Sequence, residues 1–161
     1  MTARKPYVAP DALCSIERSL AVVGERWSLL ILRQAHSGTT RFADFQSALG
    51  LSPQVLTARL TTLVAAGVLE PREYRVAGAR TRVDYHLTVA GRELRLVLGA
   101  LQQWGDDHLR SPGDPPAYGR RRVADERPVR VAFVAEDGRT AAVDEVSIAA
   151  DPDRTFVKGL R

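Results

Sequence analysis

Apolar residues recur at about every third or fourth position through much of the chain before residue 110, which is the spacing of one face of an α-helix. The pattern predicts two helices within residues 12–37, the first capped by Ser15 and separated from the second by Gly24. It also predicts a short third helix over residues 41–49, followed by a tight turn at Gly50. The chain is therefore expected to begin with three closely spaced helices.

A fourth helix is predicted directly after this turn, in the sequence SPQVLTARLTTLVAAG. Ser52 is followed by Pro53, and a capping serine with proline at the first helical position is a strong helix start. Gly67 suits a C-terminal stop, so the helix is expected to run from Pro53 to Ala66. Its apolar stripe consists of Leu56, Leu60, Leu63 and Val64.

The opposite side of this fourth helix carries small, neutral side chains where a surface helix usually has Lys and Glu. At about 100° per residue, this side holds Gln54, Thr57, Ala58 and Thr61. No Asp or Glu occurs between Pro53 and Leu69. One interpretation is a helix that enters the major groove of DNA, because glutamine pairs with adenine and threonine contacts bases. The alternative is a surface helix whose low charge has no functional meaning.

A strand, a loop and a second strand are predicted next. Residues 68–74 form the first strand, and the alternation of apolar and polar residues over 83–87 is typical of a half-buried second strand. The hairpin carries four cations, Arg72, Arg75, Arg80 and Arg82, and Glu73 is counted as the one acid that opposes them. Such a hairpin suits contact with phosphates or with the minor groove, although a run of charges is more often a solvated surface.

A long helix is predicted from its cap at Thr88 to about Leu109. Its apolar seam consists of Leu94, Leu98, Leu101 and Trp104. This seam is more apolar than the terminal helix of one small domain requires, which favours a dimer interface. The alternative is that the helix folds back on its own core.

The last third of the chain has a different composition. Residues 111–128 are rich in Pro, Gly and Arg and are predicted to be a linker, whose arginine run at 120–122 is either solvated or in contact with DNA. Residues 129–161 are predicted to form a β-hairpin extension with a loose tail. An isolated hairpin is marginally stable, so it is expected to pack on another part of the protein. Residues 1–110 are then the DNA-binding and dimerisation domain.

Together these elements predict an α+β, mainly helical fold: a winged helix-turn-helix with a C-terminal β-hairpin extension. The recognition helix spans about residues 52–66 and enters the major groove, and the arginine-rich wing spans about residues 72–85. The predicted DNA-binding residues are Arg41, Ser52, Gln54, Thr57, Ala58, Arg59, Thr61, Arg75, Arg80 and Arg82. The alternative is a module in which the C-terminal hairpin senses a ligand or a protein and DNA binding is secondary.

The charge is compatible with a nucleic-acid partner. Net charge is +4, and the excess lies in residues 1–110, which contain 14 basic and 10 acidic residues. No apolar run approaches the roughly 20 residues of a membrane span and no signal peptide is recognisable, so a soluble, cytoplasmic protein is expected. His36, His86 and His108 lack metal-ligand spacing, and no nucleotide-binding loop or catalytic setting is recognisable. Neither an enzyme nor a cofactor is therefore expected.

A specific set of positions within residues 12–110 carries a family resemblance. The matching positions are Cys14, Ile16-Glu17, Gly24, Arg26-Trp27, Leu29-Leu30-Ile31-Leu32, Arg41-Phe42, Ser52, Leu56-Thr57, Arg59-Leu60, Gly67, Tyr85, Leu87-Thr88 and Gly91. This set resembles the HxlR-type transcriptional regulators, within the broader MarR-like winged-helix group. The resemblance implies a homodimer that binds an operator as a repressor or an activator. The family usually has Gly-Gly-Lys-Trp where this chain has GERW, and it often has wing-tip prolines that this chain lacks.

Cys14 is the only cysteine, so no disulfide can form within one chain. It lies at the predicted start of the first helix, and helix N-termini favour the reactive thiolate form of cysteine. The resemblance implies a role in sensing oxidants or quinones, since several HxlR-type regulators use a cysteine at this position. The alternative is a buried, inert side chain, the usual fate of a lone cysteine. An oxidant or small-molecule effector is thus an open expectation.

Overall fold

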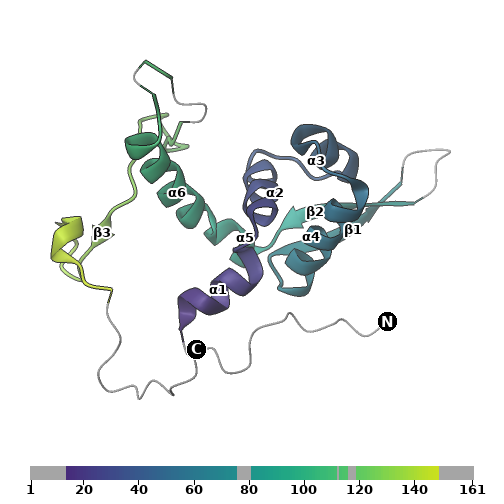
Figure 1. Ribbon diagram of the computed structural model, residues 1–161, viewed down its shortest axis with the longest axis horizontal. Coiled ribbons are helices and arrows are strands. Elements are labelled where there is room, and N and C mark those ends of the chain that lie inside the picture. Colours follow the sequence, from purple (N-terminus) through teal and green to yellow (C-terminus); the bar gives the residue numbers. More distant parts are fainter. Residues whose placement is uncertain (1–13, 76–80, 112, 116–118, 149–161) are drawn as a thin grey trace. The chain divides into compact units, whose positions relative to one another are not determined.

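The computed structural model describes residues 14–75, 81–111, 113–115 and 119–148. The chain divides into two compact units, Met1–Leu98 and Gly99–Arg161, and each is described by itself. The first unit contains, in chain order (Figure 1), helices α1 (Ser15–Val23), α2 (Arg26–His36), α3 (Phe42–Leu49) and α4 (Pro53–Ala65), strands β1 (Leu69–Tyr74) and β2 (Arg82–Leu87), and helix α5 (Val89–Glu93). Helix α6 (Arg95–His108) begins in the first unit and continues into the second, which also contains β3 (Phe133–Val134), β4 (Thr140–Ala141) and the 3-10 helix η1 (Val143–Glu145).

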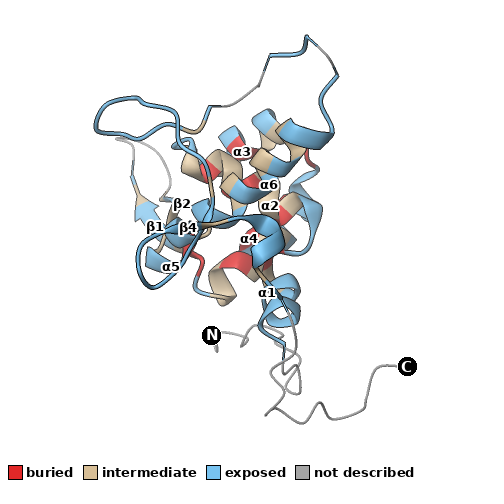
Figure 2. Cartoon of the chain, turned by 90° about the vertical axis from the view of Figure 1, so that its left-hand side faces the viewer, coloured by how far each residue is buried: buried red, intermediate tan, exposed pale blue. Residues whose placement is uncertain are grey.

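The core of the first unit forms where α2, α3 and α4 meet. Its fully buried apolar side chains on these helices are Ile31, Leu32, Phe45, Leu56, Leu60 and Leu63. Figure 2 shows this burial in red on the helices, whereas α1 is mostly exposed. Burying one large apolar side chain stabilises a fold by about 1.5–3 kcal/mol, so the leucine stripe predicted on α4 is what fixes that helix. The helix-rich α+β prediction and the stripe are both confirmed.

The turn that connects α3 to α4 is built as predicted. Gly50 has a φ of 63°, a left-handed conformation that glycine adopts without steric cost. Ser52 then caps α4, because its Oγ accepts a hydrogen bond from the Val55 backbone N–H at 3.4 Å. Pro53 is the first helical residue. The turn and the cap together set the direction in which α4 leaves α3.

The predicted hairpin is confirmed after α4. Gly67, with a φ of 70°, ends the helix, and β1 pairs with β2 in antiparallel register from Leu69 opposite Leu87 to Tyr74 opposite Arg82. The order of α3, a tight turn, α4 and a two-stranded hairpin is that of a winged helix-turn-helix.

The base of this hairpin is attached to the helices on both sides. The Tyr85 N–H donates a hydrogen bond to the Thr40 carbonyl at 2.8 Å, which joins β2 to the segment before α3. The Thr88 hydroxyl donates to the Gly67 carbonyl at 2.6 Å, which joins the end of β2 to the end of α4. The wing is therefore placed relative to both helices of the helix-turn-helix.

Two predicted helix boundaries in the first unit are wrong. Cys14, not Ser15, is the N-cap residue of α1, and no side chain donates or accepts a capping hydrogen bond there. The helix predicted from Thr88 to Leu109 is interrupted at Leu94, which is the C-cap of α5. A regular apolar spacing continues across this break, so the sequence pattern alone did not reveal it.

Gly91 in α5 is required by close packing. A Cβ at this position would lie 2.1 Å from the Val68 carbonyl oxygen, a separation that no side chain tolerates. The Thr88 hydroxyl accepts a hydrogen bond from the Gly91 N–H at 3.1 Å and so caps the same turn. These contacts hold α5 against the strand that leads into the wing.

The second unit has no buried residue among those described. Its predicted hairpin is present but short, with Phe133 opposite Ala141 and Val134 opposite Thr140, and Gly138 occupies the turn with a φ of 82°. The longer strands expected from the alternating sequence are not formed, and Phe133 and Val134 are 45% and 64% exposed.

The described part of the predicted linker, residues 111–128, is partly paired. Arg121 and Pro128 form an isolated β-bridge, and the Val129 N–H donates to the Arg120 carbonyl at 2.9 Å. The Gln103 side-chain amide binds the backbone of Val131 twice, once as donor and once as acceptor, at 3.0 Å each. This part of the chain is therefore a folded turn held against α6. Among the described residues, no helix is long and apolar enough to cross a membrane.

Candidate nucleic-acid interface

The outward side of α4 presents the neutral polar surface predicted from the sequence. The exposed side chains on it are Gln54, Thr57, Ala58 and Thr61. Leu56, Leu60 and Leu63 on the other side are at most 1% exposed, so the helix cannot rotate to bury the polar side. The structure therefore brings together an acid-free row of hydrogen-bonding groups on one capped, firmly packed helix.

Ser52 and Arg59 flank this row in different ways. The Ser52 hydroxyl is already engaged as the N-cap, although its side chain remains exposed. Arg59 is half-buried beside the leucine stripe. The Thr62 hydroxyl donates to the Ala58 carbonyl at 3.0 Å, so it is occupied by the helix itself. Among the described residues, the side chains of Gln54, Thr57 and Thr61 form no hydrogen bond, so they are available to a partner.

Apart from Glu73, the charged side chains of the two wing strands lie on one face. From the register, the residues on this face are Glu70, Arg72, Tyr74, Arg82, Asp84 and His86, whereas Leu69, Tyr85 and Leu87 on the other face contact the core. Glu70 accepts a hydrogen bond from the Arg72 Nε at 2.9 Å, and Asp84 lies 3.0 Å from the His86 Nε2.

The prediction that Glu73 is the only acid opposing the wing arginines is therefore wrong. Glu70 and Asp84 lie on the same face as the cations, and Glu73 lies on the opposite face. Arg72, one of the predicted wing cations, is paired with Glu70. The signal missed in the sequence was strand alternation, which places Glu70 two residues from Arg72 on the same side.

The remaining wing arginines differ in how they are held. The Arg75 Nε donates to the Thr81 Oγ1 at 2.7 Å, which links the two strands where the tip begins. Arg82 is exposed. Arg80 lies outside the described residues. Arg41, the N-cap of α3, is exposed, and its guanidinium Cζ lies 5.3 Å from the centre of the Tyr74 ring. Sequence reasoning missed Tyr74.

The arginine run at 120–122 is engaged within the second unit. The Arg120 Nη1 lies 2.9 Å from the Asp106 Oδ2, and the Arg121 Nη1 donates to the Glu126 carbonyl at 2.9 Å. The Arg122 guanidinium donates to both carboxylate oxygens of Asp125, which lowers the pKa of that carboxyl group. Each of these arginines therefore takes part in a contact that stabilises a turn, while the Arg122 side chain is still 60% exposed.

Asp106 and Asp107 are likewise ion-paired. Asp106 binds Arg120, and the Asp107 Oδ2 lies 3.1 Å from the Arg130 Nη2. The described residues contain no group of three or more His, Cys, Asp or Glu side chains that could hold a metal ion.

The predicted dimer seam divides into two parts. Leu94 and Leu98 are half-buried and pack against the core cluster of the first unit. Leu101 and Trp104 are 49% and 56% exposed, and they lie about one turn apart on α6. The Trp104 ring also contacts the His108 ring, with centroids 5.4 Å apart. Of the four seam residues, only Leu101 and Trp104 are exposed enough to contact a partner chain.

Cys14 is exposed and forms no disulfide. The alternative of a buried cysteine is therefore wrong. The residue is the N-cap of α1, and its carbonyl accepts a hydrogen bond from the Arg18 N–H at 3.1 Å.

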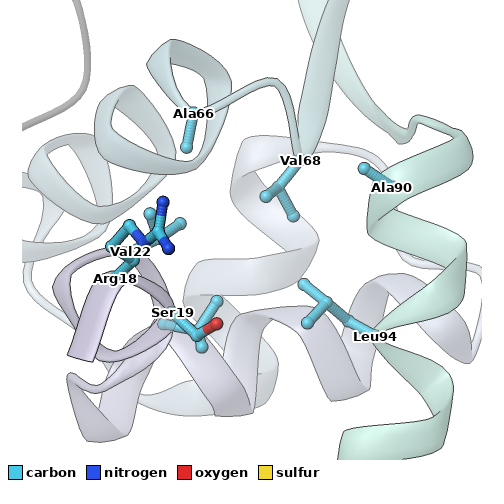
Figure 3. Close-up of a pocket in the computed structure, with 8 residues that line it drawn as sticks. Arg18, Ser19, Val22, Ala66, Val68, Ala90 and Leu94 are labelled. Atoms are coloured by element: carbon cyan, nitrogen blue, oxygen red, sulfur yellow. The ribbon is translucent and has the colours of Figure 1, made fainter. Parts of the chain in front are cut away.

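A pocket of about 270 Å³ lies beside α1 (Figure 3). Figure 3 shows Arg18, Ser19 and Val22 on α1 facing Ala66 at the end of α4 and Leu94 beyond α5. All of its lining residues belong to the first unit. The pocket therefore gives no support to the alternative in which the C-terminal hairpin forms a sensing site.

His36 connects the end of α2 to the start of α6. Its Nδ1 accepts a hydrogen bond from the Arg95 Nε at 3.3 Å. Burial lowers the pKa of His36 below its ordinary value of 6.5, and the positive charge of Arg95 lowers it further, while a backbone hydrogen bond with Gly91 partly opposes both effects. The neutral imidazole is thus the form that this junction accommodates.

Comparison with known proteins identifies the family. Residues 22–112 match the family described as HxlR-like helix-turn-helix. The HTH-type transcriptional regulator Mb3122 of Mycobacterium bovis, itself uncharacterised, is 40% identical over 112 residues, which cover 70% of this chain and 70% of that protein. The chain belongs to the HxlR-like helix-turn-helix family. It is a DNA-binding transcriptional regulator of the HTH type and not an enzyme.

Solved structures agree with this assignment. PA1607, a candidate transcription factor, is 36% identical with a TM-score of 0.74, and the match covers 87% of this HxlR-like chain and 96% of PA1607. The redox regulator HypR in its reduced form is 26% identical with a TM-score of 0.54, covering 60% of this chain and 94% of HypR. The similarity to PA1607 thus extends beyond the residues that define the family.

Proposed function

We propose that this HxlR-like protein acts as a dimer that binds an operator, with α4 reading base edges in the major groove and the wing holding the DNA backbone. The observation that carries the proposal is the exposed row of Gln54, Thr57, Ala58 and Thr61 on a helix whose opposite side is fully buried. The major groove of B-DNA admits one helix, and its base edges offer the donors and acceptors that these side chains match.

The wing supports this proposal through its charge. Arg82 and Arg75 are exposed cations on or beside the polar face of the hairpin, and Arg41 lies next to that face. Phosphate contacts from such residues position a protein on DNA without reading its sequence. Base reading by α4 and backbone contact by the wing are therefore separable by mutation.

The test begins with selection from a random duplex library to identify the preferred operator. Binding of the full chain to that operator and to a scrambled duplex is then titrated at several salt concentrations. Thr57→Ala is expected to cost about 1–3 kcal/mol on the operator and much less on the scrambled duplex. Equal losses on the two duplexes would contradict base reading by α4.

The dimer is supported by the exposed part of α6. Leu101 and Trp104 place two large apolar side chains in solvent on one side of the helix, and Trp is frequent among the residues that dominate interface energies. A dimer also provides two recognition helices for the two half-sites of an operator.

Trp104→Ala is expected to weaken the dimer by about 2 kcal/mol or more, a roughly 30-fold rise in its dissociation constant, with little effect on monomer unfolding. Sedimentation equilibrium measures the constant. Val123→Ala is a matched control, because Val123 is 86% exposed in the same unit and lies outside α6. An unchanged dimer in Trp104→Ala, or a monomeric wild type at micromolar concentration, would contradict this interface.

A second candidate function, regulation by oxidation, is favoured by the exposure of Cys14 at the start of α1. The similarity to the redox regulator HypR supports it. A peroxide would convert the Cys14 thiol to a sulfenic acid and release water, and a second thiol would then displace another water to form a disulfide. That thiol must be Cys14 of a second subunit or a small molecule, since the chain has no other cysteine.

Operator binding before and after mild peroxide, in the wild type and in Cys14→Ser, tests this function. Release of the wild type alone is expected. Release of both proteins, or retention of both, would show that Cys14 is not the switch. A non-reducing gel distinguishes an intersubunit disulfide from a mixed disulfide with a small thiol.

A further inference from the structure

Arg41 lies where the helix-turn-helix meets the wing. As the N-cap of α3, its carbonyl accepts hydrogen bonds from the N–H groups of Asp44 and Phe45, both at 3.1 Å. On its other side, Arg41 forms an isolated antiparallel bridge with Asp84 of β2. Phe45 is fully buried, so the Arg41 backbone is fixed by the core as well as by the wing.

The Arg41 side chain, by contrast, is exposed and is directed by an aromatic ring. Its guanidinium Cζ lies 5.3 Å from the centre of the Tyr74 ring, within the range of about 6 Å for a cation–π contact. Tyr74 is half-buried at the end of β1, opposite Arg82 on the polar face of the wing. The ring therefore gives a defined place to a side chain that would otherwise sample many rotamers.

The Arg41 guanidinium forms no ion pair with its bridge partner Asp84. Asp84 faces the same side of the wing, and its Oδ2 lies 3.0 Å from the His86 Nε2. Within the described ranges, Arg41 has no ion-pair partner at 4.0 Å or less. The Arg41 guanidinium is therefore able to bind an external anion. Its N–H groups point outward in the guanidinium plane, and stacking on the Tyr74 ring does not occupy these donors.

We infer that Tyr74 is a positioning residue that holds the Arg41 guanidinium for one phosphate of the DNA backbone, at the junction of α3 and the wing. This inference rests on the proposed function, because it assigns a role within the same DNA contact. A contact from this junction fixes the wing and the helix-turn-helix on the duplex together. A preorganised side chain loses less conformational entropy when the phosphate arrives, which is how the ring strengthens binding.

A double-mutant cycle on the full chain tests the inference with the selected operator as the probe. Arg41→Ala is expected to weaken binding and to lower the slope of log K against log salt by about 0.9, the value for one phosphate. Tyr74→Leu is expected to weaken binding about threefold, whereas Tyr74→Phe, which keeps the ring, binds like the wild type. In the Arg41→Ala background, Tyr74→Leu should have no further effect.

A merely structural role for Tyr74 gives a different result, since a weakened wing would lower affinity equally in both backgrounds. Such additivity would overturn the positioning role and leave base reading by α4 intact. If Tyr74→Leu does not fold, Tyr74→Trp replaces it: the larger ring should strengthen binding in the wild-type background and not in Arg41→Ala. Equal effects of Tyr74→Trp in both backgrounds would also overturn the inference. Absence of specific binding by the wild type would instead overturn the proposed function itself.

Discussion

Each of the two units of the chain is stabilised internally by a different kind of interaction. In the first, residues from α2, α3 and α4 form an apolar core in which six large side chains on these helices are fully buried. In the second, no described residue is buried, and polar contacts join its segments: the Gln103 amide on the Val131 backbone, Arg120 on Asp106, and Arg130 on Asp107.

This difference predicts how each unit responds to change. In an apolar core, a single large-to-small substitution lowers the free energy of unfolding by several kcal/mol, and salt has little effect on this loss. Ion pairs that are partly exposed contribute about 0–1 kcal/mol and weaken as salt rises. The first unit is therefore expected to give a rigid platform to the DNA-binding surface, and the second to open locally at much lower cost.

The largest expected effect comes from breaking the core of the first unit. Leu60→Ala removes a side chain that is 1% exposed, and this type of change typically costs about 2–5 kcal/mol of unfolding free energy. Urea unfolding followed by circular dichroism measures the loss. Val129→Ala, at a 43% exposed position in the second unit, is the control and should cost less than about 1 kcal/mol. Similar costs at both positions would contradict the comparison.

The two arginine-rich segments provide the next test. Arg82→Ala is expected to weaken binding to every duplex about tenfold and to reduce the salt slope by about 0.9, because an exposed wing cation is lost. Arg122→Ala should leave the slope unchanged, because the charge of the Arg122 guanidinium is already paired with the Asp125 carboxylate. Titration across salt concentrations distinguishes the two variants, and a slope change for Arg122→Ala would place the second unit in the DNA contact.

A smaller effect is expected from Arg120→Ala. The ion pair with Asp106 is about one-fifth exposed, and its loss should reduce local stability by about 1 kcal/mol. Hydrogen exchange at the Val129 and Val131 amides should accelerate by up to about tenfold, while amides in α2 and α4 keep their protection. Acceleration throughout the first unit would show that the two units unfold as one.

The smallest effect concerns pH. The folded-state pKa of His36 lies below its ordinary value of 6.5, so the unfolded chain binds the proton more readily. The stability contributed by neutral His36 is fully present above pH 6.5 and is lost as pH falls through the lowered folded-state pKa. His36→Gln should remove this part of the pH dependence, whereas His108→Gln, at an exposed position, should not. The measurement is the urea midpoint of each variant at pH values above and below 6.5. The same pH dependence in both variants would contradict the role of His36.

Sequence predicted the first unit well because helical periodicity records burial. The leucine stripe of α4, the cap at Ser52 and the turn at Gly50 each follow from local residue preferences, and the structure confirms them. The interruption at Leu94 escaped prediction because the apolar spacing continues across it while the chain closes on Val68 through Gly91. Such a close approach depends on residues that are distant in sequence.

The second unit was harder to predict because its contacts have no periodicity. Nothing local indicates that Gln103 pairs with the backbone of Val131, or that the arginines at 120–122 are engaged within their own unit. The candidate site shows the same limit. The α4 surface followed from helical geometry, whereas the contact of Arg41 with Tyr74 depends on tertiary packing. The tip arginine Arg80 lies outside the described residues.

The central claim is that α4 reads bases while the wing only holds the backbone. Selection from a random duplex library, repeated with the wild type, Gln54→Ala and Arg82→Ala, tests it most directly. Gln54→Ala is expected to relax the preference at one or two base pairs and to keep the salt slope. Arg82→Ala is expected to select the same sequence as the wild type with a lower salt slope. An unchanged selected sequence for Gln54→Ala, or a changed one for Arg82→Ala, would contradict the account.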